Sequence, residues 1–256
     1  MKNMRFLGTG SVTGQEIITN KDLELMIGDG FDPSRTPLCF SDWVEELTGI
    51  KERRWTRDET TEDMMTEASR LALEDAELTI NDIDFIISVS ETGDSIIPDP
   101  SIEISHRLGN SNIPGFTFDA ACAGSLYGLY LAYPFIANGI HKKILLVAGE
   151  TLHKRLNRDP TTFILLGDAA GAVVLGADNE KGISSMPYVG ASYSKSITIT
   201  ENMPNDPRVK LDGRNSGCII MGSGKNVFKN AVNSMCGAGI MAIEESDFEL
   251  EEIQER

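Results

Sequence analysis

Short apolar runs alternate with longer amphipathic segments along most of this sequence. The runs expected to form strands cover residues 4–9, 85–90, 116–119, 144–148, 171–175 and 218–221. Residues 61–77 and 226–243 instead carry apolar side chains at the spacing of about 3.6 residues that is typical of a helix. Gly237 and Gly239 weaken the later turns of the second helix. This alternation predicts an α/β layer protein rather than an all-α or all-β one.

One segment is similar to a later segment of the same chain. Residues 72–84 and residues 242–254 both read as the end of a helix, a turn and an acidic lead-in. The acidic segment of the first copy directly precedes the strand expected at 85–90. The acidic segment of the second copy is followed by Arg256, where a matching strand would begin. Because a repeat unit does not bury its apolar face alone, we expect a duplicated architecture with an incomplete second copy. Residues 1–175 would form the first half and residues 176–256 the start of the second. The alternative is that the two helix ends are unrelated.

The charge and the cysteines exclude several classes of function. A net charge of −16 and a pI near 4.6 argue against nucleic acid or an anionic membrane as a partner, although local basic clusters stand at 51–54 and 141–143. We expect a cytoplasmic protein, because no run reaches the about 18 uninterrupted apolar residues of a membrane span and no apolar leader follows the start. The cysteines at 39, 122, 218 and 236 form no CxxC pair, which favours reduced thiols and no metal site.

The most informative stretch is a strand, a tight turn of small residues and an apolar helix, over residues 115–132. Cys122 lies in that turn, at the expected start of the helix. Unpaired backbone N–H groups and the positive end of the helix dipole favour a thiolate there and would also hold an oxyanion. The small neighbours leave room for an acyl chain. This context predicts that Cys122 is an acyl-accepting nucleophile; a buried structural cysteine is the alternative.

The run Asp119-Ala120-Ala121-Cys122-Ala123-Gly124 resembles the nucleophile motif of the β-ketoacyl-[acyl-carrier-protein] synthase III family, in the thiolase superfamily. Other runs follow in the family's order, at Gly8-Thr9-Gly10, Asn20-Lys21-Asp22-Leu23, Thr48-Gly49-Ile50, Gly167-Asp168-Ala169-Ala170-Gly171 and Gly224-Lys225-Asn226. The resemblance covers essentially the whole chain. It implies a homodimer with a thiolase-like, five-layered α/β/α/β/α fold of two related halves, of which the second is incomplete here.

The family's chemistry implies two steps at Cys122. The thiol would take an acyl group from acyl-CoA, and the acyl group would then condense with malonyl-ACP as carbon dioxide leaves. Acyl-CoA and the acyl carrier protein are thus the implied partners, and no cofactor is needed beyond these substrates. The family also uses a His and an Asn in decarboxylation. None of the three histidines of this sequence stands in the family's His-Gln-Ala-Asn context; they are His106, His141 and His153.

Other positions are carried over from the same resemblance. Trp43 and Thr48 match positions at the nucleotide end of CoA, although Trp43 has an equally good interpretation as a half-buried anchor. Ile97 matches the residue that reaches across the dimer interface to close the partner's acyl pocket. Gly224 opens a run that we count among the substrate-binding positions. Leu47 stands where the family often has an Arg, so the choice of CoA over a carrier protein as acyl donor stays open. The run 167–171 lacks a P-loop Lys and is expected to be a packing turn.

Two other functions remain open from the sequence. A thiolase-fold acyltransferase would move the acyl group from Cys122 to an alcohol or an amine without decarboxylation. A non-catalytic partner subunit would only complete a heterodimer. Malonyl-dependent release of carbon dioxide would select the condensing enzyme, and failure of any acyl-CoA to label Cys122 would leave the partner subunit.

Overall fold

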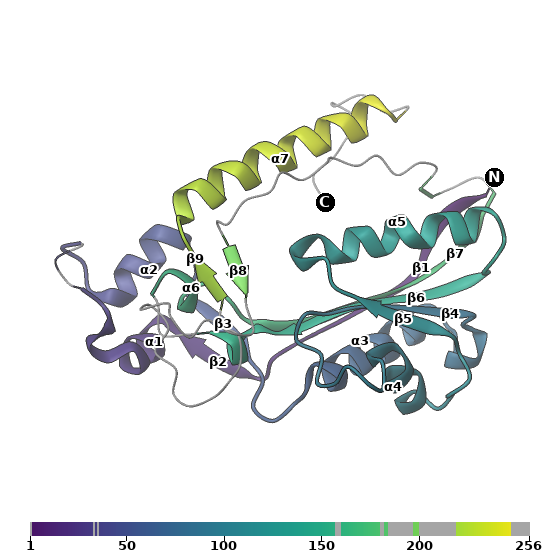
Figure 1. Cartoon of the computed structure of the whole chain (residues 1–256), viewed down its shortest axis with the longest axis horizontal. Coiled ribbons are helices and arrows are strands. Elements are labelled where there is room, and N and C mark those ends of the chain that lie inside the picture. Colours follow the sequence, from purple (N-terminus) through teal and green to yellow (C-terminus); the bar gives the residue numbers. More distant parts are fainter. Residues whose placement is uncertain are drawn as a thin grey trace.

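Five strands form the central sheet, in the order β1-β7-β6-β4-β5 (Figure 1). The computed structural model describes residues 2–32, 34, 36–156, 160–179, 182–183, 197–199 and 219–246. The strands are β1 (Asn3–Thr13), β4 (Phe85–Val89), β5 (Gly115–Phe118), β6 (Lys143–Thr151) and β7 (Asp168–Asp178). β7 runs antiparallel to β1 and β6, and β4 runs parallel to β5 and β6. The carboxyl ends of β4, β5 and β6 therefore meet at one edge of the sheet.

Helices cover both faces of this sheet. Along β6, Leu145 and Val147 belong to one core cluster, and Ile144 and Leu146 belong to another. Because successive side chains of a strand point to opposite faces, the continuous apolar run of β6 supplies both cores. Figure 1 shows α3 (Thr61–Asp75) and α4 (Pro100–Arg107) on one face and α5 (Gly124–Ala137) on the other. The α/β layer architecture predicted from the sequence is confirmed.

Two glycines let α3 lie directly against β1. A Cβ added to Gly8 would come within 2.4 Å of the Ala76 backbone nitrogen, and one added to Gly10 within 2.3 Å of the Ala68 carbonyl oxygen. Any larger residue at these two positions would push the helix away from the sheet. The Gly8-Thr9-Gly10 run is thus explained by close packing.

A smaller lobe adjoins one end of the sheet. Its hairpin pairs β2 (Glu16–Thr19) with β3 (Glu52–Trp55) in antiparallel register. α1 (Asn20–Ile27), the 3-10 turn η1 (Gly28–Gly30), α2 (Phe40–Thr48) and α6 (Pro160–Phe163) follow around it. These elements share a separate core, made by Ile18, Leu23, Ile27, Phe40, Val44, Trp55, Phe163 and Ile164.

The last described elements are β8 (Ile197–Ile199), β9 (Ile219–Met221) and α7 (Gly224–Glu244). β8 and β9 pair in antiparallel register, and Cys218 of the expected strand lies outside the described residues. α7 passes through Gly237 and Gly239 without a break and buries none of its side chains, so that Phe228 is 72% exposed. Among the described residues, no helix has the length and apolar character required to cross a bilayer.

The structure of residues 167–171 differs from the expectation drawn from the sequence. We predicted a packing turn there, and this was wrong, because β7 begins at Asp168 and pairs with β6 and β1 along its length. Ala170 is 4% exposed and belongs to the same core cluster as Met65 of α3. The small residues of the run are therefore needed where α3 packs on the middle of the sheet.

Candidate active site

Cys122 lies between β5 and α5, in the 3-10 turn η4 (Ala121–Ala123). Ala121 has φ of +49°, in the left-handed region that residues other than glycine rarely adopt. The residue before α5 is Ala123, which offers no side-chain cap to the first turn. The thiol of Cys122 is exposed. An accessible sulfur thus stands beside backbone N–H groups that no side chain caps, which suits acyl transfer through an oxyanion.

Close packing fixes where α5 begins. A Cβ added to Gly124 would lie 2.3 Å from Val89 Cγ1, and one added to Gly128 would lie 2.4 Å from Leu146 Cδ1. Both glycines are buried against the sheet. The first turn of α5, and with it Cys122, is held at the carboxyl end of β4 by these contacts.

Three carboxyl groups gather near the same edge because three parallel strands end there. Glu91 follows β4, Asp119 follows β5, and Glu150 is the penultimate residue of β6. Asp119 Oδ1 accepts the backbone N–H of Ala121 at 2.8 Å. Glu150 Oε1 accepts the backbone N–H of Glu91 at 2.7 Å. The contacts tie the turn after β4 to the end of β6 and tie Asp119 to the residue before the nucleophile.

Burial and crowding raise the pKa of two of these carboxyl groups. For Glu91, burial is the largest cause, followed by the charges of Asp119 and Glu150 and by a side-chain hydrogen bond with Asp119; the pKa is raised to about 7. Burial also raises the pKa of Glu150, although hydrogen bonds from Thr92 and from the Glu91 N–H oppose it. Close to neutral pH the Glu91 carboxyl therefore still carries its proton for part of the time.

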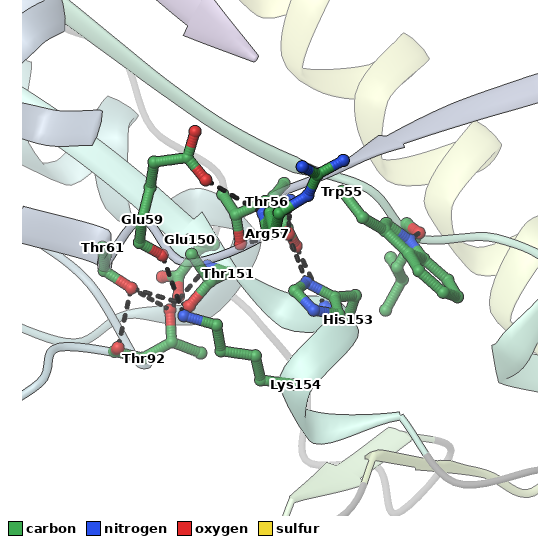
Figure 2. A network of polar contacts seen from close by, with 12 residues as sticks. Trp55, Thr56, Arg57, Glu59, Thr61, Thr92, Glu150, Thr151, His153 and Lys154 are labelled. Atoms are coloured by element: carbon green, nitrogen blue, oxygen red, sulfur yellow. Dashed lines mark hydrogen bonds and ion pairs between the residues drawn. The ribbon is translucent and has the colours of Figure 1, made fainter. Parts of the chain in front are cut away.

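Buried threonines hold the turn that carries Glu91 (Figure 2). The Thr61 hydroxyl donates to the Thr92 carbonyl at 2.8 Å, and the backbone N–H of Thr151 donates to Thr92 Oγ1 at 2.9 Å. The Thr92 hydroxyl in turn donates to the Glu150 carboxylate. Side chains from α3, β6 and the turn itself meet in this network, so the position of Glu91 is set by three elements at once.

His153 contacts Trp55 and Asp168. Its ring stacks on Trp55, with centroids 5.1 Å apart and planes at 17° (Figure 2). Its Nδ1 contacts the carboxylate of Asp168, which is 2% exposed and also accepts the Thr56 backbone N–H at 2.8 Å. Burial would raise the pKa of Asp168, but the hydrogen bonds from His153 and Thr56 outweigh it and hold the pKa below its ordinary value.

The other two histidines also make contacts of their own. His106 of α4 bonds to the Ser111 hydroxyl at 2.9 Å. His141 stacks on Phe85, with centroids 4.6 Å apart.

The remaining residues singled out in the sequence are spread over the molecule. Trp43 of α2 is half-buried and packs on Phe31 and Phe40. The Thr48 hydroxyl donates to the Val44 carbonyl at 2.7 Å and accepts the Ile50 N–H at 3.0 Å, so it closes the end of α2.

Ile97, in the loop before α4, is 89% exposed. Gly224 is the exposed first residue of α7. α2 and the start of α7 lie at the end of the molecule away from the body of α5 (Figure 1).

An apolar hollow of about 510 Å³ lies beside α5, bounded by the helix and by β1, β6 and β7. Ser125, three residues after the nucleophile, stands at its wall. The full lining consists of Phe6, Thr9, Gly10, Ser125, Leu129, Leu146, Ala148, Gly171, Ala172 and Val173.

A mixed sheet with helices on both faces, and a cysteine between a strand and the helix that crosses it, defines a thiolase-like α/β protein. A family model described as 3-oxoacyl-[acyl-carrier-protein (ACP)] synthase III matches residues 116–193. The β-ketoacyl-[acyl-carrier-protein] synthase III of Xanthomonas campestris pv. campestris is 36% identical over 234 residues, which are 90% of this chain and 68% of the relative. That of Listeria welshimeri is 34% identical over 255 residues, 98% of this chain and 74% of the relative.

A solved structure agrees with these relatives. The 3-oxoacyl-(acyl carrier protein) synthase III of Pseudomonas aeruginosa PAO1 superposes with a TM-score of 0.79 at 25% identity, over 95% of this chain and 71% of that structure. The chain belongs to the 3-oxoacyl-[acyl-carrier-protein] synthase III family. The family resemblance stated from the sequence is thereby confirmed.

The sequence reasoning did not find Glu91, Glu150 or the pair of His153 and Asp168. A signal for the two glutamates was present, because each stands near the end of a strand that was predicted. No comparable local signal existed for His153 and Asp168, which lie 15 residues apart in the chain.

Proposed function

We propose that Cys122 accepts an acyl group from acyl-CoA and that the protein then condenses it with malonyl-ACP. The observation that carries this proposal is the exposed thiol of Cys122, one residue before Ala123, which leaves the start of α5 without a side-chain cap. Membership of the synthase III family supports it, because the relatives are named for making 3-oxoacyl carrier proteins.

In the first step, the Cys122 thiolate attacks the thioester carbonyl carbon of acyl-CoA. The carbonyl π electrons move to oxygen, and the N–H groups at the start of α5 would stabilise that oxyanion. When the oxyanion collapses, the carbon–sulfur bond to CoA breaks and CoA leaves as its thiolate. The acyl group is then held on Cys122 as a new thioester.

In the second step, malonyl-ACP loses its carboxylate as carbon dioxide. The electron pair released at the α-carbon attacks the acyl-Cys122 carbonyl, and the Cys122 thiolate leaves. The product is a 3-oxoacyl-ACP, extended by two carbons. His106, His141 and His153 each make contacts with other residues of this chain and are not proposed to hold the malonyl thioester.

We assign the other positions by family resemblance. Trp43 and Thr48 would contact the nucleotide end of CoA, and Gly224 would line the substrate path. Ile97 would approach the acyl pocket of a second copy, and its 89% exposure supports such a homodimer. Residues 1–175 and 176–256 would belong to two related halves. In support, α3 ends at Asp75 and α7 ends at Glu244. The separation of these two helix ends matches, within one residue, the offset between the similar segments 72–84 and 242–254.

The experiment is an assay of carbon dioxide release from malonyl-ACP in the presence and absence of acyl-CoA. We expect release that depends on acyl-CoA and is lost in Cys122→Ala. Acyl transfer to an alcohol or an amine without carbon dioxide release would instead select the acyltransferase function. No acylation and no release would leave a non-catalytic partner subunit.

A further inference from the structure

We propose that Asp119, supported by Glu91, is the residue that positions the Cys122 turn. This inference rests on the proposed function insofar as it concerns acyl transfer, but the geometry that carries it does not depend on the identity of the substrate. Asp119 opens the run 119–124 that predicted the nucleophile, whereas Glu91 lies outside it, and neither residue is proposed to touch the acyl group.

The first observation is the conformation of Ala121. Its φ of +49° is one that a residue with a Cβ rarely adopts, so the turn needs an outside contact to persist. The Asp119 carboxylate supplies this contact, since Oδ1 accepts the Ala121 N–H at 2.8 Å. The peptide that is held in this way leads directly into Cys122. Asp119 therefore acts on the thiol through the backbone.

The second observation is that Asp119 is itself held. Its carboxyl group shares a side-chain hydrogen bond with Glu91, whose backbone N–H is bound by Glu150 at 2.7 Å. The next residue, Thr92, is fixed by Thr61 and Thr151 (Figure 2). Contacts thus run without a gap from α3 and β6, through Glu91 and Asp119, to the nucleophile.

A hydrogen bond between two carboxyl groups needs a proton, because two neighbouring carboxylates repel each other. The charged groups that face Glu91 are Asp119, after β5, and Glu150, on β6. Below about pH 7 the Glu91 carboxyl keeps its proton and can donate it to Asp119. Above about pH 7 Glu91 loses that proton, which removes its support of Asp119 and weakens the hold on Ala121.

The experiment measures alkylation of Cys122 by iodoacetamide across pH 5.5–9.0 in the purified protein, with each cysteine followed by peptide mass spectrometry. Cys39 is exposed in the smaller lobe and serves as a reference inside the same molecule. We expect Asp119→Ala to slow alkylation of Cys122 by about tenfold with no change at Cys39. Asp119→Asn keeps an acceptor for the Ala121 N–H and is expected to restore most of the rate.

The conservative variant Glu91→Gln separates positioning from a general loss of structure. The Gln side chain keeps a donor to Asp119 but does not titrate. We therefore expect that the change of slope near pH 7, in the plot of the Cys122 alkylation rate against pH, is present in the wild type and absent from this variant. Asn110→Ala is the matched control, because Asn110 Oδ1 accepts the Asn112 N–H at 3.0 Å in the same two-residue geometry at the opposite end of β5. Asn110→Ala should leave the alkylation rate of Cys122 and its pH dependence unchanged.

Equal rates and profiles at Cys122 for wild type, Asp119→Ala and Glu91→Gln would overturn the inference. Failure of Asp119→Asn to restore the rate lost in Asp119→Ala would also overturn it. Because iodoacetamide reports on the thiol alone, the inference can hold even where no acyl-CoA labels Cys122. The proposed function and the positioning role thus fail by different results.

Discussion

Gly124 lies so close to Val89 that a Cβ on the glycine would stand 2.3 Å from Val89 Cγ1. This contact joins the first turn of α5, which follows the nucleophile, to the end of β4. The Gly residue of the nucleophile motif is therefore required by packing, and the position of Cys122 depends on it.

Replacing Gly124 with Ala should destabilise the protein and slow acylation of Cys122 together. Overpacking of this kind lowers the free energy of unfolding by about 1–3 kcal/mol, and we expect a value in that range by urea denaturation. Gly237→Ala is the control, since a Cβ there meets nothing within 4 Å on α7 and should not lower the stability. Wild-type stability and acylation rate in Gly124→Ala would contradict the packing role.

Removing the buried carboxylate of Asp168 should lower the stability of the protein more than neutralising that carboxylate. Asp168→Ala leaves the Thr56 N–H, at 2.8 Å in the native protein, and the His153 N–H, at 3.0 Å, without an acceptor. We expect the free energy of unfolding to fall by about 3 kcal/mol. Asp168→Asn keeps one hydrogen-bond acceptor and should lose less stability than Asp168→Ala. Equal losses in the two variants would show that the hydrogen bonds are not what Asp168 contributes.

The pH dependence of stability should have opposite signs in two windows. The pKa values of Glu62 and Glu91 are both raised to about 7, with burial as the largest cause in each case. A raised folded-state pKa gives stability that is lost as pH rises, here between about 4.5 and about 7. The lowered pKa of Asp168 gives stability that is lost instead as pH falls below about 4.

Glu62→Gln tests the first of these windows. Glu62 is 2% exposed and accepts the Asp94 N–H at 2.8 Å, so it is the clearest source of the effect. The melting temperature of the wild type should decrease from pH 5.5 to pH 8, and Glu62→Gln should flatten that decrease. Glu46→Gln changes the same charge at an exposed position and should keep the wild-type slope. If the two variants behave alike, net charge rather than Glu62 controls the slope.

An arginine at position 47 should strengthen binding of CoA thioesters. Leu47 is 62% exposed on α2, one residue before Thr48, where the family often has an Arg. If Trp43 and Thr48 contact the nucleotide end of CoA as proposed, a guanidinium at position 47 would lie near its phosphates, so we expect Leu47→Arg to lower the KM for acyl-CoA about fivefold with kcat unchanged. Leu25→Arg adds the same charge on α1, where Leu25 is 83% exposed, and should have little effect. Equal effects of the two variants would indicate nonspecific attraction.

The elements that local patterns predict are the strands of the main sheet and the long helices. The expected strands at 85–90 and 144–148 match β4 and β6 to within three residues at each end, because their apolar runs serve two cores. The family motif located Cys122 between β5 and α5, since a strand followed by small residues and an apolar helix leaves few alternatives.

The smaller lobe was not predictable in the same way. Residues 51–54 read as a basic cluster, yet Arg53 is 6% exposed. Its guanidinium donates to the Ile18 carbonyl at 3.2 Å and to the Ile164 carbonyl at 2.8 Å. Contacts so distant in the chain leave no periodic pattern, and the same holds for His153 and Asp168. Tertiary hydrogen bonds, rather than propensity, decide these segments.

The proposed function requires that Cys122 carries the acyl group. The most direct measurement is mass spectrometry of the purified protein after incubation with a panel of acyl-CoAs, with the adduct mapped by peptide digestion. We predict a mass increase equal to one acyl group, located on Cys122, absent from Cys122→Ala and blocked by prior alkylation of that thiol. An adduct on Cys39 or Cys236 instead, or no adduct with any acyl-CoA, would contradict the proposed role of Cys122.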